Sequence, residues 1–431
     1  MKAAGCAMVA LLVCAPGECR AEVPAGETPD APAPASAAPS EAPTGFDGRS
    51  NGLVDDATHA ADREAFDEAE TPDDGLGPVY NAQACRECHQ SPVSGAASQL
   101  TELRVGHLDR LGRFANPAIP IGDGREAIRG RSLVNDRTVC PSEAFPDLDA
   151  TSHVPRGESI RTRRISLGLL GDGFVEAIPS GSLVALAAEQ CRRSRGRICG
   201  EVVLVPVLEA GGALRVGRFG WKAQHASLLS FSADAYLNEM GITSRLLPDE
   251  IATRCDAVPD PEDETGEDGL DDIDRFARFM RALPAPARDA AIAAEREAIA
   301  GRERFRAIGC DVCHVETHVT APAGSVVNAG ALEVPEALGD KRIHPFSDFL
   351  LHDVATGDGI VQNGGERTAR RLRTAPLWGL RLRTRLMHDG ASLGTEAALL
   401  RHGGEAAGAV YRYRELPRRV QEELLRFLAS L

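Results

Sequence analysis

Two stretches of the chain place large apolar residues at the spacing of one helix face. The first lies at residues 276–283 and is followed by Pro284 and Pro286, and the second closes the chain at residues 420–431. Apolar residues three and four apart share one face of an α-helix, and proline ends it. The pattern predicts two amphipathic helices, each the last helix of its own unit. Their apolar positions are Phe276, Phe279, Met280, Leu283, Val420, Leu424, Phe427, Leu428 and Leu431.

A third helix is predicted over residues 288–305, where alanine and other helix-favouring residues dominate. Because it would open a second unit, we expect an N-terminal domain at residues 46–286 and a C-terminal domain at residues 287–431. The N-terminal domain also contains two strand-like apolar runs, at residues 201–207 and 214–219. The predicted fold class is mainly α, with two domains and a few short strands and irregular loops in the first.

The first 45 residues differ in composition from the rest. Residues 1–21 combine a charged start, an apolar centre and small residues near Ala21, which is typical of a cleaved export signal. This segment is too short to span a bilayer. An uncleaved anchor, with lipid attached at Cys14 or Cys19, is the alternative. Residues 22–45 are rich in Pro, Ala, Ser and Glu and predict a disordered tether. We therefore expect a periplasmic protein without a membrane span.

Two short motifs, at residues 85–89 and 310–314, each place two cysteines three apart and a histidine directly after them. The thiols can add to the vinyl groups of one haem, and the histidine then becomes the proximal iron ligand. A zinc site or a redox dithiol could also use such a cysteine pair, but neither copy has a second pair nearby to complete a four-cysteine site. The motifs predict two covalently bound haem c groups. The residues assigned to them are Cys85, Cys88, His89, Cys310, Cys313 and His314.

Outside both motifs and the predicted export signal, four cysteines remain: Cys140, Cys191, Cys199 and Cys255. An even number suits the disulfides of an oxidising compartment. Cys191 and Cys199 flank a basic loop that a disulfide between them could close. Four cysteines allow three pairings, and their spacing does not decide among them.

The chain is acidic, with 63 Asp and Glu against 48 Lys and Arg and a formal net charge of -15. This excess argues against nucleic acid as a partner. For a haem protein it favours a basic or neutral electron donor, such as a small cytochrome c or a cupredoxin, that docks on an acidic face.

Six further segments extend the pattern over nearly all of the chain that follows the predicted signal. They are residues 75–83, 217–223, 239–244, 346–353, 374–380 and 387–390. In this order they resemble the di-haem oxidoreductase family, sometimes labelled thiol oxidoreductases, which is related to bacterial di-haem cytochrome c peroxidases. The resemblance implies two cytochrome c-like domains with one haem each. It also implies that electrons enter at the C-terminal haem and that chemistry occurs at the N-terminal haem.

The resemblance further suggests sixth ligands for the two irons. In the related peroxidases the distal ligand of the C-terminal haem follows the segment that matches residues 387–390, and the matching residue here is His402. A bis-histidine iron would have a lower potential than the His/Met iron common in the peroxidases. His107 lies where the peroxidases place a removable distal histidine of the N-terminal haem. A surface role is the alternative for both histidines.

The resemblance also points to two residues for the chemistry. Trp221 matches a tryptophan that relays electrons between the haems, although a core role is the alternative for a large aromatic residue. Glu239 matches the acid that assists cleavage of the peroxide O–O bond, which requires a raised pKa in an apolar pocket. The peroxidases have a glutamine about ten residues after the tryptophan, whereas this chain has Phe231. That difference bears directly on the expectation of peroxidase activity.

Four more residues in or near the matching segments are expected to have supporting roles, without ligating iron. His352 and His388 would bond to a haem propionate or to the backbone, and Arg373 and Arg381 would pair with propionates. The related peroxidases hold calcium between their domains. No acidic cluster here has the EF-hand spacing, so the sequence itself predicts no calcium site, and the resemblance alone leaves calcium as one possible further ion.

The sequence therefore predicts an exported di-haem c-type cytochrome oxidoreductase, with reduction of hydrogen peroxide as the leading activity. A non-catalytic electron carrier, with both irons six-coordinate, is one alternative. A haem oxidase or oxygenase that acts on an organic or protein substrate is the other. Thiol oxidation is disfavoured because haem-bound thioethers cannot exchange with thiols.

Overall fold

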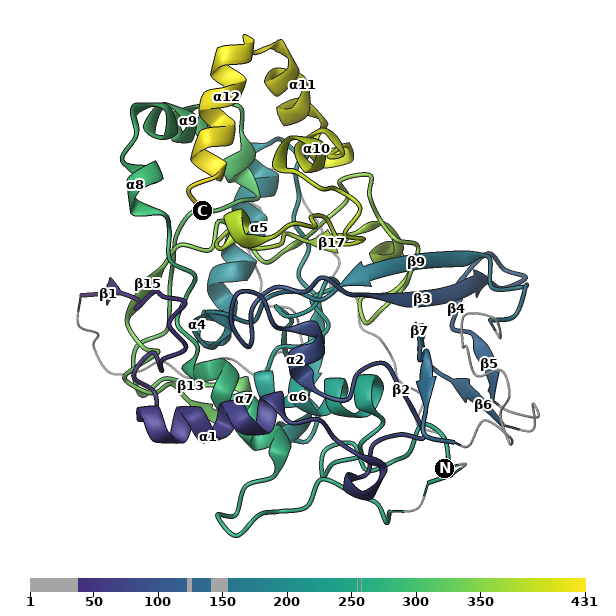
Figure 1. Cartoon of the computed structure of the whole chain (residues 1–431). Helices are drawn as coiled ribbons and strands as arrows, with labels where there is room; N and C mark the ends of the chain where they lie inside the picture. The colour runs from purple at the N-terminus through teal and green to yellow at the C-terminus, as the bar shows by residue number, and fades with distance from the viewer. Residues whose placement is uncertain (1–37, 122–125, 141–153, 254, 257) are drawn as a thin grey trace.

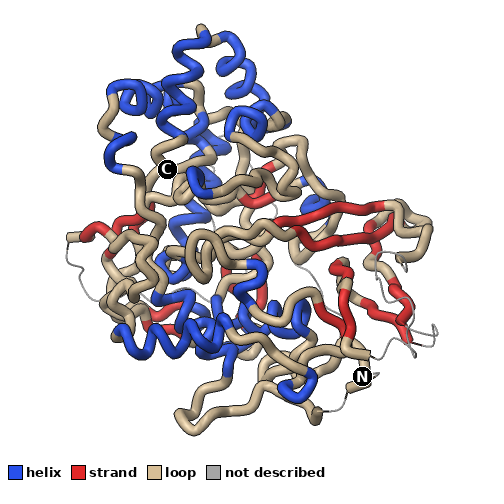
Figure 2. The backbone as a smooth tube through the Cα atoms, viewed as in Figure 1, coloured by secondary structure: helices blue, strands red, loops and turns tan. Residues whose placement is uncertain are grey.

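The structure is a computed structural model that describes residues 38–121, 126–140, 154–253, 255–256 and 258–431. The predicted export signal and residues 22–37 of the predicted tether lie outside this part. Of the described residues, 33% are helical and 17% are in strands. The fold is therefore mixed rather than mainly α, because the segments between the helices pair into many short strands (Figure 2).

The helices of the described residues differ widely in length. Those that carry the packing are α1, α5, α7, α9, α11 and α12, and the shorter ones position loops. They are α1 Asp56–Asp67, α2 Cys85–Cys88, α4 Asp172–Glu176, α5 Ser180–Arg193, α6 Leu228–Ala235, α7 Asp272–Ala282, α8 Ala290–Ala293, α9 Arg296–Ala307, α10 Thr395–Leu400, α11 Ala407–Glu415 and α12 Arg418–Leu428.

The strands form small, mostly antiparallel sheets. The longest pairing joins β3 to β9 in a twisted ribbon that projects from one side of the molecule (Figure 1). The strands are β1 Ser40–Glu41, β2 Val79–Tyr80, β3 Thr101–Leu108, β4 Phe114–Ala115, β5 Ala118–Ile121, β6 Glu126–Arg129, β7 Leu133–Val134, β8 Arg137–Thr138, β9 Ile160–Ile165, β10 Leu204–Val207, β11 Ala213–Val216, β12 His318–Val319, β13 Val326–Val327, β14 Leu332–Glu333, β15 Lys341–Ile343, β16 Leu351–His352 and β17 Leu372–Arg373. The sheets are β1-β15-β12, β4-β3-β7 with β9 on β3, β10-β11, β13-β14, β16-β17, β2-β8 and β5-β6.

The amphipathic helices at residues 276–283 and 420–431 are confirmed as α7 and α12. Each buries its apolar face, and α7 begins with a capping box formed by Asp271 and Asp274. The predicted opening helix is split at Glu295 into α8 and α9. The strand-like runs of the first half are confirmed as β10 and β11, each shorter than expected.

Helices α9 and α12 cross at very close range. Gly301 on α9 makes this approach possible, because a Cβ atom there would lie only 1.9 Å from the carbonyl oxygen of Glu423 on α12. Phe305 on α9 and Phe427 on α12 then stack edge to face, with ring centres 5.4 Å apart. The pair forms the wall against which the second cysteine motif is held.

The apolar core crosses the expected domain boundary. The main cluster joins α4, α6 and α7 to residues that follow residue 286, among them Val327, Leu338, Phe349 and Trp378. A smaller cluster draws only on residues 305–431. Among the described residues, no helix has the length and apolar character that crossing a bilayer requires.

The end of the predicted tether is ordered. β1 pairs in parallel with β15, and Gly45 N donates a 3.0 Å hydrogen bond to the Ala285 carbonyl oxygen. Ala42 is buried in the main cluster. Polar composition did not reveal this segment because its pairing uses backbone atoms.

Two disulfides close loops in the first half. Cys140 bonds to Cys255, and Cys191 bonds to Cys199, which settles the pairing that the spacing left open. The four motif cysteines, Cys85, Cys88, Cys310 and Cys313, are not in disulfides. The eight cysteines outside the predicted signal thus separate into a structural and a motif set.

A buried ion pair of the N-terminal part of the chain also bonds to a residue of the C-terminal part. Glu176 is fully buried and accepts two hydrogen bonds from Arg281 on α7, of 2.6 and 3.0 Å. It also accepts one from Leu228 N and one from Asn328 Nδ2, at 2.8 and 2.9 Å. Burial would raise the pKa of Glu176, but the guanidinium of Arg281 outweighs it and holds that pKa below its ordinary value.

Arg281→Leu is therefore expected to destabilise the protein by about 3–5 kcal/mol at neutral pH, because a buried carboxylate would lose its cation. The contribution of Glu176 exists above the pKa of an unfolded glutamate and is lost as pH falls through its depressed folded value. The difference between wild type and variant in urea unfolding should thus shrink in acid. Arg275→Leu, on the same helix, is the control and should change stability little, because Arg275 pairs with the solvent-accessible carboxylates of Asp268 and Asp272. Equal effects of both variants would contradict the assignment.

Candidate functional site

A cavity of about 600 Å³ lies against the second cysteine motif. The motif follows α9 in a 3-10 turn, and the residues after α10 form the opposite wall. A cavity of this volume is in the range that holds cofactors. Among its lining residues are Cys310, Cys313, His314, Trp221, His388 and His402.

His314 and His402 face one another across this cavity, with ring centres 6.5 Å apart. Two imidazoles that ligate one metal from opposite sides, at metal–nitrogen distances of about 2 Å, have ring centres about 6 Å apart. His314 Nδ1 donates to the Phe346 carbonyl oxygen and His402 Nδ1 donates to that of Ala398, both at 2.9 Å. Each Nε2 therefore keeps its lone pair, as second-shell hydrogen bonds to metal-ligating histidines ensure. The pair fits a six-coordinate haem iron.

Burial lowers the pKa of His314 to about 4 and also lowers the pKa of His402. Both rings are therefore neutral at pH 7, which is the form that binds a metal.

The first motif forms the short helix α2, followed by His89. Burial lowers the pKa of His89 to about 4, so this ring is also neutral. His89 lies near the backbone of Leu167, and Cys88 lies near Ser166. Phe66 packs beside His89 with ring centres 6.4 Å apart. The segment that follows β9 thus covers the first motif.

The motif thiols do not have the character of a reactive dithiol. Burial raises the pKa of Cys88 and of Cys310, each to about 12. Redox-active and metal-binding cysteines have lowered pKa values instead. Among the described residues, no four-cysteine cluster forms, because Cys313 gathers only with Asp348 and His352. The described surroundings of the second motif therefore do not form a four-cysteine zinc site.

Glu239 lies in a π-helical turn, Tyr236–Met240, that continues α6. Asn81 Nδ2 donates to its Oε2 at 2.9 Å, and the Asn81 backbone N–H donates to its carbonyl oxygen at 2.7 Å. Burial and the neighbouring Glu102, which shares a hydrogen bond with it, raise the pKa of Glu239 well above its ordinary value. Both carboxyl groups lie close enough to Cys88 to act on its thiol. A protonated carboxyl group therefore lies beside the first motif.

Glu102 takes the opposite protonation state. Burial would raise its pKa, but the guanidinium of Arg104, whose Nε donates to Glu102 Oε1 at 2.5 Å, holds the pKa of Glu102 below its ordinary value. Two adjacent carboxyl groups whose environments push their pKa values apart are typical of an acid–base site.

Trp221 lines the cavity of the second motif and reaches toward the first. Its Nε1 donates to the carbonyl oxygen of Ile165 at 2.8 Å, one residue before the segment that covers Cys88 and His89. Its ring meets that of His388 edge to face, with centres 6.2 Å apart.

His107 lies far along the β3–β9 ribbon. β3 begins beside the first motif, where Thr101 pairs with Ile165. His107 is six residues further, about 20 Å at the rise of a strand. Its Nδ1 instead bonds to Glu158 Oε2 at 2.8 Å. The structure does not bring His107 to the first motif.

His352 lies beneath the second motif between two carboxylates. Its Nε2 bonds to Asp348 Oδ2 at 2.9 Å and its Nδ1 to Glu405 Oε2 at 2.8 Å. Burial would lower its pKa, but these carboxylates hold the pKa of His352 well above its ordinary value. His352 is thus a buried imidazolium whose two ring nitrogens both bond to carboxylates. They do not make the expected hydrogen bond to a haem propionate or to the backbone.

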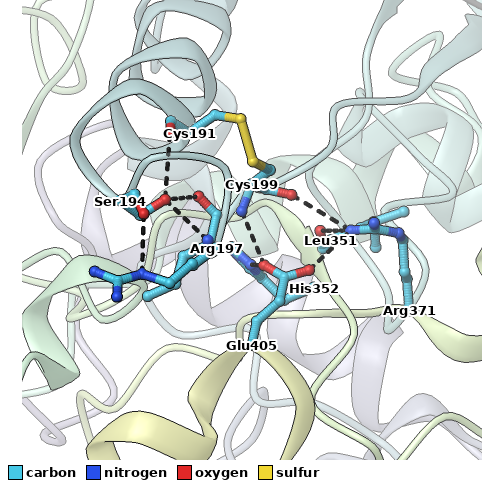
Figure 3. Close-up of a disulfide and its surroundings, with 9 residues drawn as sticks. Cys191, Ser194, Arg197, Cys199, Leu351, His352, Arg371 and Glu405 are labelled. Atoms are coloured by element: carbon cyan, nitrogen blue, oxygen red, sulfur yellow. Dashed lines mark hydrogen bonds and ion pairs between the residues drawn. A yellow bond between two sulfur atoms is a disulfide. The ribbon is translucent and has the colours of Figure 1, made fainter.

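The same network reaches the surface through a disulfide loop (Figure 3). Cys199 N donates to Glu405 Oε2 at 3.0 Å. Arg371 bonds to the Cys199 carbonyl oxygen and to Glu405 Oε1. The closed loop Cys191–Cys199 is therefore fixed directly to the residues that support the second motif.

The remaining expected residues take varied positions. Arg373 lines the cavity with its Nε bonded to the Gly220 carbonyl oxygen, and burial lowers its pKa to about 10. His388 is buried on the same wall, and its Nδ1 has no hydrogen-bond partner among the described residues. Arg381 instead bonds to the backbone carbonyls of Ala287 and Leu431. Phe231 packs in α6 against the ring of His225.

Two sets of carboxylates were not predicted from the sequence. One set bonds to residues of the site, and the other is a cluster of four acids. Asp348 stands four residues before His352 in a matching segment, so its pairing was accessible to inspection, whereas Glu102 and Glu405 carry no local signal. A group of four acids also gathers ligand oxygens within 4.8 Å of one another. It has no EF-hand spacing and adds nothing to the expectation of calcium. Its members are Glu250, Asp256, Asp260 and Glu262.

Comparisons with known proteins give one strong result. The family described as "Di-haem oxidoreductase, putative peroxidase" matches residues 141–431, which include Trp221, Glu239, the second motif and His402. The first motif precedes the matched range. No curated protein matches the chain.

One solved structure, hydrazine synthase of Kuenenia stuttgartiensis pressurised with 20 bar xenon, is similar at 17% identity and a TM-score of 0.23. The match covers 37% of this chain and 55% of that chain, so this chain spans about half the length of the solved one. A TM-score that low does not indicate a shared overall fold. The family match, by contrast, covers about two thirds of the sequence and includes the cavity residues except Ala97 and Ser98. The chain belongs to the di-haem oxidoreductase family.

Proposed function

We propose that the protein is an exported di-haem c-type cytochrome that reduces hydrogen peroxide to water. The observation that carries the proposal is the adjacent carboxyl pair of Glu239 and Glu102 beside the first motif, in which burial raises the pKa of Glu239 and Arg104 lowers that of Glu102. The overall reaction consumes one peroxide, two electrons and two protons and releases two water molecules. Membership of the family supports haem as the cofactor.

The residues divide between holding the cofactors and handling protons. Cys85, Cys88 and His89 would hold one haem, and the second motif with His402 would hold the other. Bound haem would supply the one-electron chemistry and an iron that accepts peroxide at the first motif. Asn81 donates to Oε2 of Glu239, and Glu102 shares a hydrogen bond with the same carboxyl group, so both neighbours hold this proton donor in place.

Glu239 is proposed to move that proton to the peroxide oxygen that leaves as water, which is general acid work. The negative charge left on Glu239 would lie near the Arg104 guanidinium. Trp221 is proposed to relay electrons, since it lines the cavity beside the second motif and its Nε1 contacts the segment beside the first motif. The distance of His107 from the first motif supports an open coordination position there, which an electron carrier would not need.

Peroxide-dependent oxidation of a reduced small cytochrome c or cupredoxin tests this function. We expect turnover far above that of free haem at equal concentration. Activity no greater than that of free haem would overturn the proposal. Carbon monoxide should bind the reduced protein at the first haem, whereas no binding at either haem would favour a carrier.

Covalent attachment at both motifs predicts two haems per chain. Cys85→Ser/Cys88→Ser should reduce the covalently bound haem from two to one, measured by mass spectrometry of the unfolded protein purified from the periplasm. Cys140→Ser/Cys255→Ser removes a disulfide outside both motifs and should retain both haems. The same mass would report whether the chain begins after Ala21, as cleavage of the predicted signal requires. Retention of two haems by the motif variant would contradict covalent attachment there.

A further inference from the structure

The disulfide loop Cys191–Cys199 is a compact, strongly basic surface on an acidic protein. Its seven inner residues include Arg192, Arg193, Arg195 and Arg197, all exposed, in a chain of formal net charge -15. Arg192 pairs with Glu189 at 2.6 Å, and Arg193 reaches the same carboxylate only at 3.9 Å. Within the described residues, no carboxylate contacts Arg195 or Arg197. The loop therefore presents a net positive patch to solvent.

The loop has a defined shape. The disulfide joins its ends, with Cα atoms 4.3 Å apart. Inside it, Gly196 N donates to the Cys191 carbonyl oxygen at 2.8 Å. Ser194 Oγ accepts from Ile198 N and donates to the Ile198 carbonyl oxygen, both at 2.9 Å (Figure 3). A loop held in this way keeps its charges in place when a partner binds, which lowers the entropic cost of binding.

The loop also forms part of the wall of the cavity beside the second motif. Ser194, Arg197 and Ile198 line the space that contains Cys310 and His314. Directly before the loop, Gln190 Nε2 donates to the Val312 carbonyl oxygen inside the second motif at 2.6 Å. Arg193 lies close enough to the Asp311 carboxylate to interact with it electrostatically. The positive patch thus adjoins the second motif.

We propose that this loop is the docking surface for a small acidic electron-transfer protein, which delivers electrons to the C-terminal haem. This inference rests on the proposed function, in which electrons enter at that haem. In each encounter one electron leaves the metal of the reduced donor and is accepted at the second motif. The local charge at the entrance, and not the net charge of the chain, selects the donor. An acidic partner is therefore preferred over the basic one that composition favoured, since complementary patches steer encounter and raise association rates.

A pair of donors that differ only in charge tests the proposal. One is a small basic cytochrome c, and the other is the same protein after succinylation of its lysines, which reverses its net charge. At low ionic strength we expect the succinylated donor to reduce the oxidised protein at least tenfold faster in stopped-flow measurements. The rate should fall as salt rises, because the screening length shortens to about 10 Å at 0.1 M.

Arg193→Glu/Arg195→Glu should lower that rate at least tenfold and remove its salt dependence. It should also weaken calorimetric binding between the two oxidised proteins at least tenfold, a readout independent of activity. Arg110→Glu/Arg129→Glu is the matched control, because both residues are exposed, lie away from the second motif, and change the net charge by the same amount. The control should leave rate and affinity unchanged.

Three outcomes would overturn the docking proposal. The unmodified basic donor could react faster, the loop variant could match wild type, or the loop variant could lose only its sedimentation with phosphatidylglycerol vesicles, which would make the loop a lipid contact. The proposed function and the docking surface can fail independently, and the measurements distinguish the two failures. Loop-dependent reduction without peroxide turnover would remove the peroxidase and keep the docking surface, whereas peroxide turnover without loop dependence would do the reverse.

Discussion

Glu239→Gln is expected to lower peroxide turnover by a factor of about 10²–10⁴, the usual contribution of a positioned acid–base group. Glutamine keeps the size of the side chain and the hydrogen bond from Asn81 but has no proton to give. The measurement is kcat/KM for peroxide with a reduced cytochrome as donor. Haem spectra of the variant should match those of the wild type, which separates lost chemistry from lost folding.

The pH dependence of the same variant gives an independent check. The raised pKa of Glu239 means that the group stays protonated at neutral pH and loses its proton only as pH rises through that value. Wild-type turnover should therefore fall on the alkaline side, and the variant should lack this fall. Glu303→Gln, an exposed carboxyl group on α9, is the control. A variant as active as the wild type would remove Glu239 from the mechanism.

His402→Ala is expected to open a coordination position at the second motif. The reduced variant should bind carbon monoxide at one more haem than the wild type, because the 6.5 Å pairing with His314 would be lost. His402→Met should instead keep six ligands and raise the reduction potential, since methionine favours reduced iron and axial ligands set potentials over a range of about 0.8 V. Carbon monoxide titration and redox titration measure the two effects.

The control is His344→Ala. His344 is half-exposed and bonds to Glu41 at 2.9 Å, away from the cavity. It should change neither carbon monoxide binding nor potential. Carbon monoxide binding to the second haem of the wild type would show that His402 is not its ligand.

The parts of the fold that local pattern decides were predictable. Helices α7 and α12 follow from apolar residues at helical spacing, because each helix must bury one face. Short strands such as β1 and β15 were not, since two or three residues give no period and their pairing depends on distant backbone atoms. The mainly α expectation failed for this reason.

The candidate site likewise combines local features that the sequence predicts with distant contacts that it does not. The cysteine motifs are local, and the position of His402 followed from a resemblance, so both were accessible from the sequence. The partners that set protonation are not local. Glu102 meets Glu239 across 137 positions of the chain, and Glu405 meets His352 across 53. Such pairs form only when the chain folds. For the same reason His107 could match the position of a distal histidine in the sequence and yet lie far along the β3–β9 ribbon.

The pairing of β1 with β15 has a consequence for how the molecule forms. Residues 41 and 342 lie 301 positions apart, so closing this sheet requires nearly the whole chain to have emerged and collapsed. Contacts of such long sequence separation carry a large loop-closure entropy and form late. Strand β1 is thus expected to join its sheet last, after the N-terminal and C-terminal parts of the chain have packed together.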